Sequence, residues 1–424
     1  MNSTDEFQFF QGNSFSELFA SDLTDGQYGF ILNYPATARW AAYPNIKKYF
    51  IQDGSSEASK TSFDKICQKE PWKNLAVLGD TLPGVVISPP PPLLLDYWRE
   101  HLGFRYTNQE MLDCSIYLDE LSQNSRFDKL ITLFPFDRLK SEKHAVEPDI
   151  HYHLLSKVTL AELGVPCPKY STYNLHQLSL EKIQLPDRFP YLIKTSHGLS
   201  GEGTYIIKDT STLNYCLREL RKYLEIKLLD TIVVSEFIQN VVQNYCVQFY
   251  VNKAGRITLI GATSQLVTSE GNYLGGLIHY RETDMSKFLE MIAAIGKYAH
   301  QQGYFGVIGF DVLEDSEGQF FVIDANFRVN GSTPLCLQRH TLLGLGKEVA
   351  KYSSDYRMNG ALDSVFMTLE SELKRKDFII LSALEKSKYG KIYTDIYGII
   401  AGETIKELQQ IENSLQQKGL QTMG

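Results

Sequence analysis

The sequence predicts a multidomain protein, with an α/β domain near its N-terminus and α+β domains beyond it. Its 424 residues exceed one ordinary hydrophobic core and indicate two to four domains. The first 150 residues alternate short apolar runs with longer mixed segments, which is typical of buried parallel strands joined by helices. Beyond residue 189, strand-like runs follow one another closely across short turns, which favours antiparallel sheet.

Four apolar runs in the first 150 residues are predicted to be strands. They span residues 28–33, 74–79, 84–88 and 129–134. Ser88 is followed by four prolines, which are stiff and poor in hydrogen-bond donors, so this segment is predicted to be an extended connector. A new domain is expected near residue 149, where residues 151–164 read as one helix closed by Gly164.

The remaining boundaries follow from the same reading. We predict domains at residues 1–148, 149–365 and 366–424, and we divide the second into subdomains at about 149–237 and 238–365. Strands are expected at 378–383 and 391–401. A final helix is expected from Thr404, because Glu407 three residues later completes a capping box.

Composition restricts the class of protein. Hydrophobic residues make up 43% of the chain and charged residues 22%, as in globular proteins. The formal net charge of −8 gives no positive field for a phosphodiester backbone, so we expect no nucleic-acid partner. The start lacks a secretory signal, and prolines interrupt the apolar stretch 82–97, so a cytoplasmic protein without a membrane partner is expected. The cysteines lack metal-site or disulfide spacing and are predicted to be buried; they are Cys67, Cys114, Cys167, Cys216, Cys246 and Cys336.

A lysine and a glycine-rich loop form the first candidate site. Lys194 ends an apolar strand and precedes Gly198, Gly201 and Gly203, which would let backbone N–H groups approach an anion. Phosphate binding and a plain hairpin with a surface lysine are equally compatible with this segment alone. The loop is neither a P-loop nor a dinucleotide-binding fingerprint, because the lysine precedes it and a strand follows it.

The strongest signal is an acidic hairpin at residues 307–328. The turn Asp315-Ser-Glu-Gly should pair the flanking strands and bring Asp311 nearly opposite Asp324. Asn326 shares a face with Asp324, because the two residues are two positions apart on a strand. Two carboxylates and an amide oxygen in an apolar hairpin favour Mg²⁺ over a structural aspartate pair. Arg328 beyond them could neutralise a phosphoryl oxygen or anchor a carboxylate.

A third segment, residues 231–238, is an apolar strand that ends in Ser-Glu-Phe-Ile. A purine needs an apolar slot with backbone donors and acceptors at its edge, which such a strand end can provide. Taken alone, this segment favours a core strand, because most such segments are plain core strands.

Taken in order, these segments resemble the ATP-grasp superfamily of carboxylate–amine ligases, over about residues 156–337. The resemblance implies a Rossmann-like pre-ATP-grasp domain at the N-terminus. An ATP-grasp fold of two α+β subdomains that clamp ATP would follow, and then a small C-terminal α+β domain. ATP and Mg²⁺ are the implied cofactors, and Lys194 and Arg328 the implied catalytic residues. The resemblance further implies ATP contacts from Lys157, Lys194, Ser200, Gly201, Gly203, Glu236, Phe237 and Ile238, and metal ligation by Asp311, Asp324 and Asn326. Arg281 and Ser332 are candidate substrate contacts by position, although each is better explained as an ordinary surface or helix-cap residue.

The sequence departs from the superfamily pattern at several positions. Asp324 stands where Glu is commoner and reaches one methylene less far, so its metal role requires the hairpin to bend inward. Ser235 and Phe327 also replace commoner residues. Residues 239–245, which follow the predicted adenine-binding residues 236–238, contain no acidic residue that could bind the ribose. Asn244 is the candidate in its place.

The resemblance implies an ATP-dependent ligase that phosphorylates a substrate carboxylate and joins the acyl phosphate to an amine. Small-molecule carboxylate and amine substrates are the expected partners, with a homodimer as the expected assembly if the chain oligomerises. Carboxylation is disfavoured, because no biotin-acceptor segment such as Met-Lys-Met occurs. A phosphotransferase with a stable phosphorylated product and a nucleotide-binding module without turnover remain alternatives.

Overall fold

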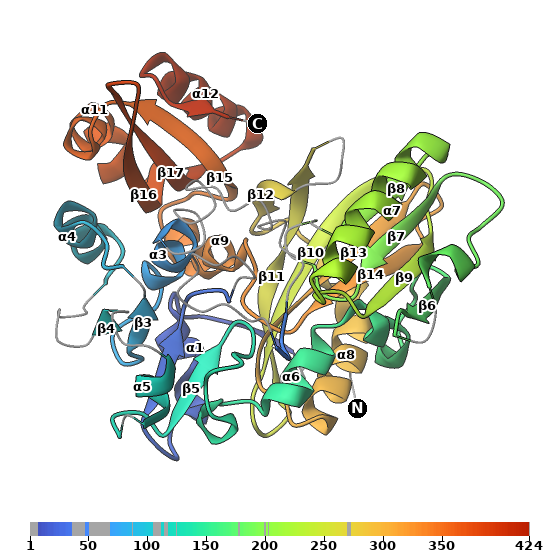
Figure 1. Cartoon of the computed structure of the whole chain (residues 1–424). Helices are drawn as coiled ribbons and strands as arrows, with labels where there is room; N and C mark the ends of the chain where they lie inside the picture. The colour runs from blue at the N-terminus through green and yellow to red at the C-terminus, as the bar shows by residue number, and fades with distance from the viewer. Residues whose placement is uncertain are drawn as a thin grey trace.

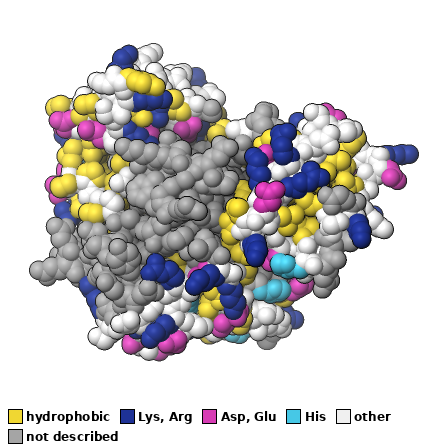
Figure 2. Space-filling model, in the orientation of Figure 1, with side chains coloured by type: hydrophobic (Ala, Val, Ile, Leu, Met, Phe, Trp, Pro, Cys, Tyr) yellow, Lys and Arg dark blue, Asp and Glu magenta, His cyan; other side chains and the backbone are white. Residues whose placement is uncertain are grey.

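The structure is a computed structural model. It describes residues 7–35, 47–50, 68–86, 88–104, 112–113, 118–123, 125–176, 179–198, 201, 203–268 and 273–423. Among these residues, no helix combines the length and the apolar character needed to cross a membrane. On the described part of the face in Figure 2, Lys and Arg side chains are interspersed with Asp and Glu side chains.

The N-terminal region contains the predicted α/β domain. Its four strands form a parallel sheet in the order β4-β3-β2-β5, with Phe30 opposite Gly84 and Gly29 opposite Leu130. The first strand of the chain, β1, instead adds to the large sheet beside β11. The elements are β1 (Gln8–Phe9), α1 (Phe15–Phe19), β2 (Tyr28–Ile31), α3 (Glu70–Leu75), β3 (Gly84–Val86), α4 (Pro92–His101), β4 (Leu112–Asp113), α5 (Leu118–Gln123), β5 (Lys129–Thr132) and α6 (Pro148–Leu154).

One of the four predicted strands is wrong. Residues 74–79 form the last turn of α3 and the turns after it, and not a strand. Pro71 lies in the first turn of α3, where its missing N–H costs nothing, so the helix starts before the apolar run. Leu75, Val77 and Leu78 are buried, as a strand would also have required. Periodicity alone does not separate these two outcomes for so short a run.

A small antiparallel sheet follows, in the order β6-β9-β7-β8. Helix α7 packs on it, and Figure 1 shows α7 in front of β7 and β8. Asp209 and Thr212 cap α7 reciprocally, and buried Cys216, Leu220 and Tyr223 line its inner face. The elements are β6 (Tyr170–Asn174), β7 (Tyr191–Thr195), β8 (Thr204–Ile207), α7 (Thr210–Glu225) and β9 (Thr231–Glu236).

The large sheet runs in the order β14-β13-β10-β11-β12-β15-β17-β16. Two short strands lie outside this order: β1 pairs with β11, and β18 pairs with β15. This one sheet contains strands from before residue 365, such as β13 and β14, and strands from after it, such as β16 and β17. The predicted domain boundary at residue 365 therefore lies between strands of the same sheet. The elements are β10 (Val241–Val251), β11 (Ile257–Val267), β12 (Tyr273–His279), α8 (Leu289–Gln301), β13 (Gly306–Asp315), β14 (Phe320–Asn326), α9 (Thr333–Leu337), α10 (Arg339–Gly344), β15 (Val349–Asn359), α11 (Leu362–Lys374), β16 (Phe378–Lys388), β17 (Lys391–Gly402), α12 (Ile405–Gln417) and β18 (Gln421–Thr422).

The predicted helix over residues 151–164 is two elements. Helix α6 ends at Leu154, and a 3-10 helix, η4 (Lys157–Leu163), follows and ends at the left-handed Gly164. Ser156 has extended backbone angles, and its hydroxyl accepts a hydrogen bond from Val158 N at 3.3 Å, which restarts the chain in a new direction. After this break, Lys157 lies beside the end of β7, where its backbone N–H donates to Ser196 O at 2.9 Å.

Other sequence predictions were more accurate. The final helix begins after Thr404, whose hydroxyl accepts a hydrogen bond from Glu407 N. Cys216, Cys246 and Cys336 are buried, and Cys167 is half-buried. Cys67 and Cys114 lie outside the described residues.

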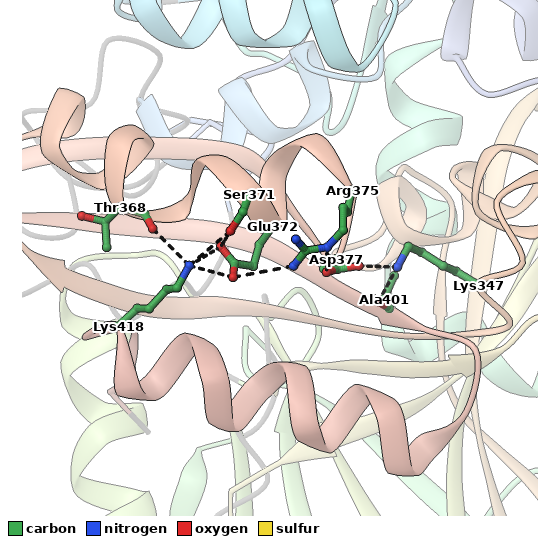
Figure 3. A network of polar contacts seen from close by, with 8 residues as sticks. All are labelled: Lys347, Thr368, Ser371, Glu372, Arg375, Asp377, Ala401 and Lys418. Atoms are coloured by element: carbon green, nitrogen blue, oxygen red, sulfur yellow. Dashed lines mark hydrogen bonds and ion pairs between the residues drawn. The ribbon is translucent and has the colours of Figure 1, made fainter.

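A polar network joins the C-terminal helices to the sheet (Figure 3). Lys418 Nζ lies 2.7 Å from Glu372 on α11, and Arg375 Nε lies 2.7 Å from Asp377. Asp377 also accepts a hydrogen bond from Lys347 Nζ at 2.6 Å, and both of these residues are buried. Because breaking a buried ion pair leaves a desolvated charge, this contact should anchor the start of β16.

We therefore expect Asp377→Asn to destabilise the C-terminal part of the sheet. The Lys347 ammonium would keep only Ala401 O, at 3.3 Å, and the amide as partners. The expected loss is about 3 kcal/mol, which corresponds to amide hydrogen exchange in β17 about a hundredfold faster. Glu370→Gln, which breaks the exposed pair with Lys374, is the control and should leave that exchange unchanged. Equal exchange in both variants would contradict the anchoring role.

Buried His144 should make stability depend on pH. Its Nε2 accepts a hydrogen bond from Phe136 N at 3.1 Å, and Lys140 O lies 3.2 Å from Nδ1, so the neutral ring fits the site. Burial lowers the pKa of His144 from its ordinary 6.5 to about 4. As pH falls below 6.5, the unfolded chain therefore takes up the proton first, and stability is lost down to about pH 4.

The expected contribution of His144 is a loss of about 2 kcal/mol at pH 5 relative to pH 7.5. His144→Gln retains a hydrogen-bond acceptor but does not titrate. Denaturant unfolding at the two pH values should show a pH effect about 2 kcal/mol smaller in the variant. An unchanged pH effect would show that His144 is not the titrating group.

Candidate functional site

A β-bulge shapes the acidic hairpin. Asp311 on β13 pairs directly with Asp324 on β14, as predicted, but Val312 pairs with Val322, so Ile323 is an extra residue. A bulge bends its strand and changes the direction of neighbouring side chains. It supplies the inward bend that the short Asp324 side chain needs, and both carboxylates line the same cavity.

Asp311 is half-buried at the cavity wall. Gln265 Nε2 donates to its Oδ1 at 2.6 Å. Burial, and then the negative charge of Asp324, raise the pKa of Asp311 to about 7. A divalent cation would relieve both effects, because it favours the ionised form of each carboxylate. The donor set of Asp311, Asp324 and Asn326 supplies oxygen atoms alone and fits Mg²⁺, which keeps waters and takes its remaining ligands from phosphates.

Two lysines converge on the same hairpin, Lys194 from the small sheet and Lys157 from the 3-10 helix η4. Lys194, at the end of β7, donates to Ile323 O at 3.1 Å, the carbonyl of the bulged residue. Lys157 Nζ lies 3.6 Å from Asp324 Oδ2. Burial lowers the pKa of Lys194 to about 8, and the charge of Asp324 opposes that change. The two ammonium groups are therefore desolvated and close to the carboxylates, as contacts for phosphate oxygens require.

The glycine loop closes against β7. Thr195 N donates to Gly203 O at 2.8 Å, and a Cβ at Gly203 would lie 2.1 Å from Thr195 Oγ1. Gly203 also has a φ of +75°, which side chains rarely adopt. Gly198 and Gly201 line the cavity with Lys194, whereas Ser200 lies outside the described residues.

The face of the small sheet that carries Lys194 also forms an apolar slot. Leu192, Ile206, Phe237 and Ile238 line it. The Glu236 carboxylate accepts a hydrogen bond from Lys169 N at 2.8 Å, and Glu236 N donates to Lys169 O at 3.0 Å, so Glu236 is fixed at the strand edge beside the slot. Asn244 Oδ1 is buried beside this slot without a hydrogen-bond partner among the described residues.

Arg328 and Asn326 are bonded to each other. Arg328 Nη2 donates to Asn326 Oδ1 at 2.7 Å, and Nη1 donates to Val329 O at 3.0 Å. The guanidinium lies over the ring of Phe134, 5.3 Å from its centroid, so the N-terminal domain helps to position it. Arg328 is buried at the cavity wall, with its Nε without a partner among the described residues.

The two substrate residues chosen by position differ in their location. Ser332 lines the cavity, and its hydroxyl accepts a hydrogen bond from Gln248 Nε2 at 2.8 Å. Arg281 is mostly exposed, pairs with Glu348 at 2.6 Å, and is absent from the described cavity wall. We therefore retain Ser332 alone as a candidate substrate contact.

The two lysines, the acidic hairpin, Arg328, Ser332 and the apolar slot share one cavity of about 540 Å³. It extends from the apolar slot, past the lysines and the acidic hairpin, to an end formed by α3 and β15. Sequence reasoning missed Gln265, Glu70 and Lys73, which line it as well. No local motif marks these three residues, because the fold of distant segments brings them to the cavity.

The fold and the site combine the features that the sequence resemblance led us to expect: two antiparallel α+β units enclose a cavity with paired lysines, a glycine loop and an acidic hairpin. Residues 168–326 match the family model described as L-aspartate–L-methionine ligase, ATP grasp. The predicted ATP-grasp resemblance is thereby confirmed over these residues.

Solved structures share the fold at low sequence identity. The L-amino acid ligase of Bacillus licheniformis is 13% identical with a TM-score of 0.51, over 78% of this chain and 95% of that one. The N5-carboxyaminoimidazole synthetase of Staphylococcus aureus, in complex with ADP, is 13% identical with a TM-score of 0.50, over 97% and 99%. The biotin carboxylase of Campylobacter jejuni is 11% identical with a TM-score of 0.52, over 94% and 92%.

Proposed function

We propose that this protein is an ATP-dependent ligase that activates a carboxylate as an acyl phosphate and joins it to an amine. The observation that carries the proposal is the single cavity in which Lys157, Lys194, the Asp311–Asp324 pair and Arg328 face one another. An amino acid pair is the first substrate class to test, because the matching family is named for a ligase of L-aspartate and L-methionine.

The nucleotide would lie along the cavity. Its adenine would occupy the slot at Phe237 and Ile238, and its phosphates would contact Lys157, Lys194 and the glycine loop. Asn244 Oδ1, buried and unpartnered among the described residues, would accept a hydrogen bond from a ribose hydroxyl. Asp311, Asp324 and Asn326 would hold Mg²⁺, which neutralises charge on the transferring phosphoryl group when bound.

Chemistry would begin when a carboxylate oxygen attacks the γ-phosphorus in line. The bond from the γ-phosphorus to the bridging oxygen breaks, and ADP leaves. Lys194 and Arg328 would stabilise charge on the phosphoryl oxygens. The amine nitrogen then attacks the acyl carbon, the C–O bond to phosphate breaks, and the amine proton passes to solvent. Positioning supplies much of the rate, so no side-chain nucleophile is needed.

The test is an ADP-release assay with amino acids supplied singly and in pairs. We expect ADP and phosphate in equal amounts with an amide product, and a hydroxamate when hydroxylamine replaces the amine. A stable phosphorylated product without hydroxamate would instead identify a phosphotransferase. If wild-type protein binds ATP but forms no ADP with any carboxylate and amine, the chain is a nucleotide-binding module.

A further inference from the structure

The cavity continues beyond the acidic hairpin to an end that the ATP-grasp elements do not form. Tyr34 and helix α3 of the N-terminal domain provide one wall, and Tyr352 and Ser354 of β15 provide the other. Helix α3 contacts both β3 and β16, and Figure 1 shows it between the N-terminal and C-terminal strands. We call this part, defined by Tyr34, Glu70, Lys73 and Tyr352, the α3 end of the cavity.

Lys73 is the main cation at the α3 end. Its side chain is only 3% exposed, and it forms an ion pair with Glu70 on the same helix. The ammonium also lies 5.6 Å from the ring centroid of Tyr397 and 5.9 Å from that of Tyr352. An ammonium has three N–H donors, and Glu70 is the one hydrogen-bonding partner found for Lys73 among the described residues. A buried ammonium with spare donors facing a cavity favours an anionic ligand.

Tyr352 supplies a second unused donor. Its side chain is fully buried and lines the cavity, yet its hydroxyl has no hydrogen-bond partner among the described residues. Glu70, by contrast, accepts a hydrogen bond from Tyr397 at 3.0 Å, which fixes the carboxylate beside Lys73. The α3 end therefore offers O–H and N–H donors without a matching acceptor.

The α3 end is close to the reacting groups. Tyr34 lines the same cavity as Arg328, which is the residue proposed to contact the acyl phosphate, and as Glu70 of α3. A substrate of amino-acid size at the acyl phosphate could extend one further group to Lys73.

We propose that the α3 end is a subsite for a second substrate carboxylate that is not phosphorylated, bound by the Lys73 ammonium and the Tyr352 hydroxyl. This inference rests on the proposed ligase function and deepens it. The carboxylate could belong to the amino acid that supplies the amine, or it could be the side chain of an acidic acyl donor. Both sources have the same chemistry and are separated by the probes below.

The test measures binding rather than turnover. Isothermal calorimetry in Mg²⁺ and ADP compares L-methionine with L-methioninamide, and L-aspartate with L-asparagine. We expect the carboxylate to bind at least about tenfold more tightly than its amide in one of the two pairs, because a charge-assisted hydrogen bond is lost in the amide. Discrimination in the methionine pair identifies the amine supplier, and discrimination in the aspartate pair identifies the acyl donor.

Two variants test whether the α3 end causes the tighter binding of the carboxylate probe over its amide. Lys73→Met should abolish this discrimination. Tyr352→Phe should reduce it severalfold without loss of stability, because the missing hydroxyl has no partner in the described structure. Tyr356→Phe is the matched control, since its hydroxyl is equally buried and unpartnered among those residues but does not line the cavity. Discrimination should persist in that control.

Three outcomes would overturn the inference: equal binding within both pairs, discrimination that survives Lys73→Met, or no binding of any of the four probes. These outcomes are separate from failure of the proposed function. A protein that binds the probes through Lys73 yet releases no ADP with any substrates would retain the subsite and lose the ligase reaction. A protein that releases ADP with substrates but does not discriminate would retain the reaction and lose the subsite.

Discussion

Replacing Asp324 with asparagine is expected to reduce Mg²⁺-dependent ADP formation at least about a hundredfold. Asp324 is positioned by the bulge at Ile323, directly opposite Asp311. An amide in its place would remove one negative charge from the cation site while keeping the size of the side chain. The effect should appear as a higher Mg²⁺ requirement and a lower kcat, both measured by coupled ADP assay.

The same change should leave the fold intact. Asp324→Asn removes the repulsion with Asp311, and it also removes a counter-charge for Lys157, so the two effects on stability oppose each other. Asp315→Asn is the matched control on the same hairpin, because Asp315 accepts turn N–H groups away from the cavity. Full activity in Asp324→Asn at low Mg²⁺ would remove Asp324 from the metal site.

Replacing Lys194 with methionine is expected to lower kcat/KM for ATP about a hundredfold. Lys194 is buried at the end of β7, and its ammonium lies 3.1 Å from Ile323 O beside the acidic hairpin. Methionine has similar length and no charge, so the main loss is the cation that would contact the phosphates. Removal of the buried ammonium relieves its desolvation cost, and it also removes a counter-charge for Asp324, so the two effects on the unfolding midpoint oppose each other.

The control for Lys194 is Lys208→Met, just beyond β8. Lys208 is exposed and lies outside the cavity wall, so ATP kinetics should match the wild type. Nucleotide titration followed by intrinsic fluorescence would separate weaker ATP binding from slower chemistry. If Lys194→Met bound and used ATP normally, the phosphate site would have to lie elsewhere.

The sequence predicted the hairpin and the pairing of Asp311 with Asp324, because turn chemistry and strand periodicity are local. It did not predict the bulge at Ile323, because a register shift depends on the neighbouring strand. The helix over 151–164 was wrong for a similar reason, since the break at Ser156 is linked to the contact of Lys157 with β7.

Local patterns also could not show the α3 end of the cavity. Glu70 and Lys73 look like an ordinary i,i+3 surface pair. They become a buried site because α3 packs against β16, and because Tyr352 and Tyr397 come from strands 279 and 324 residues after Lys73. The placement of β1 beside β11 was missed in the same way, because its pairing is long-range.

The central claim is that a substrate carboxylate attacks the γ-phosphate of ATP, and oxygen-18 transfer tests it most directly. The amino acid substrate would carry ¹⁸O in its reacting carboxylate, and mass spectrometry would follow the released phosphate during amide formation. The account predicts one ¹⁸O atom in each inorganic phosphate, because the C–O bond of the acyl phosphate breaks when the amine attacks. Unlabelled phosphate released together with the amide product would contradict it.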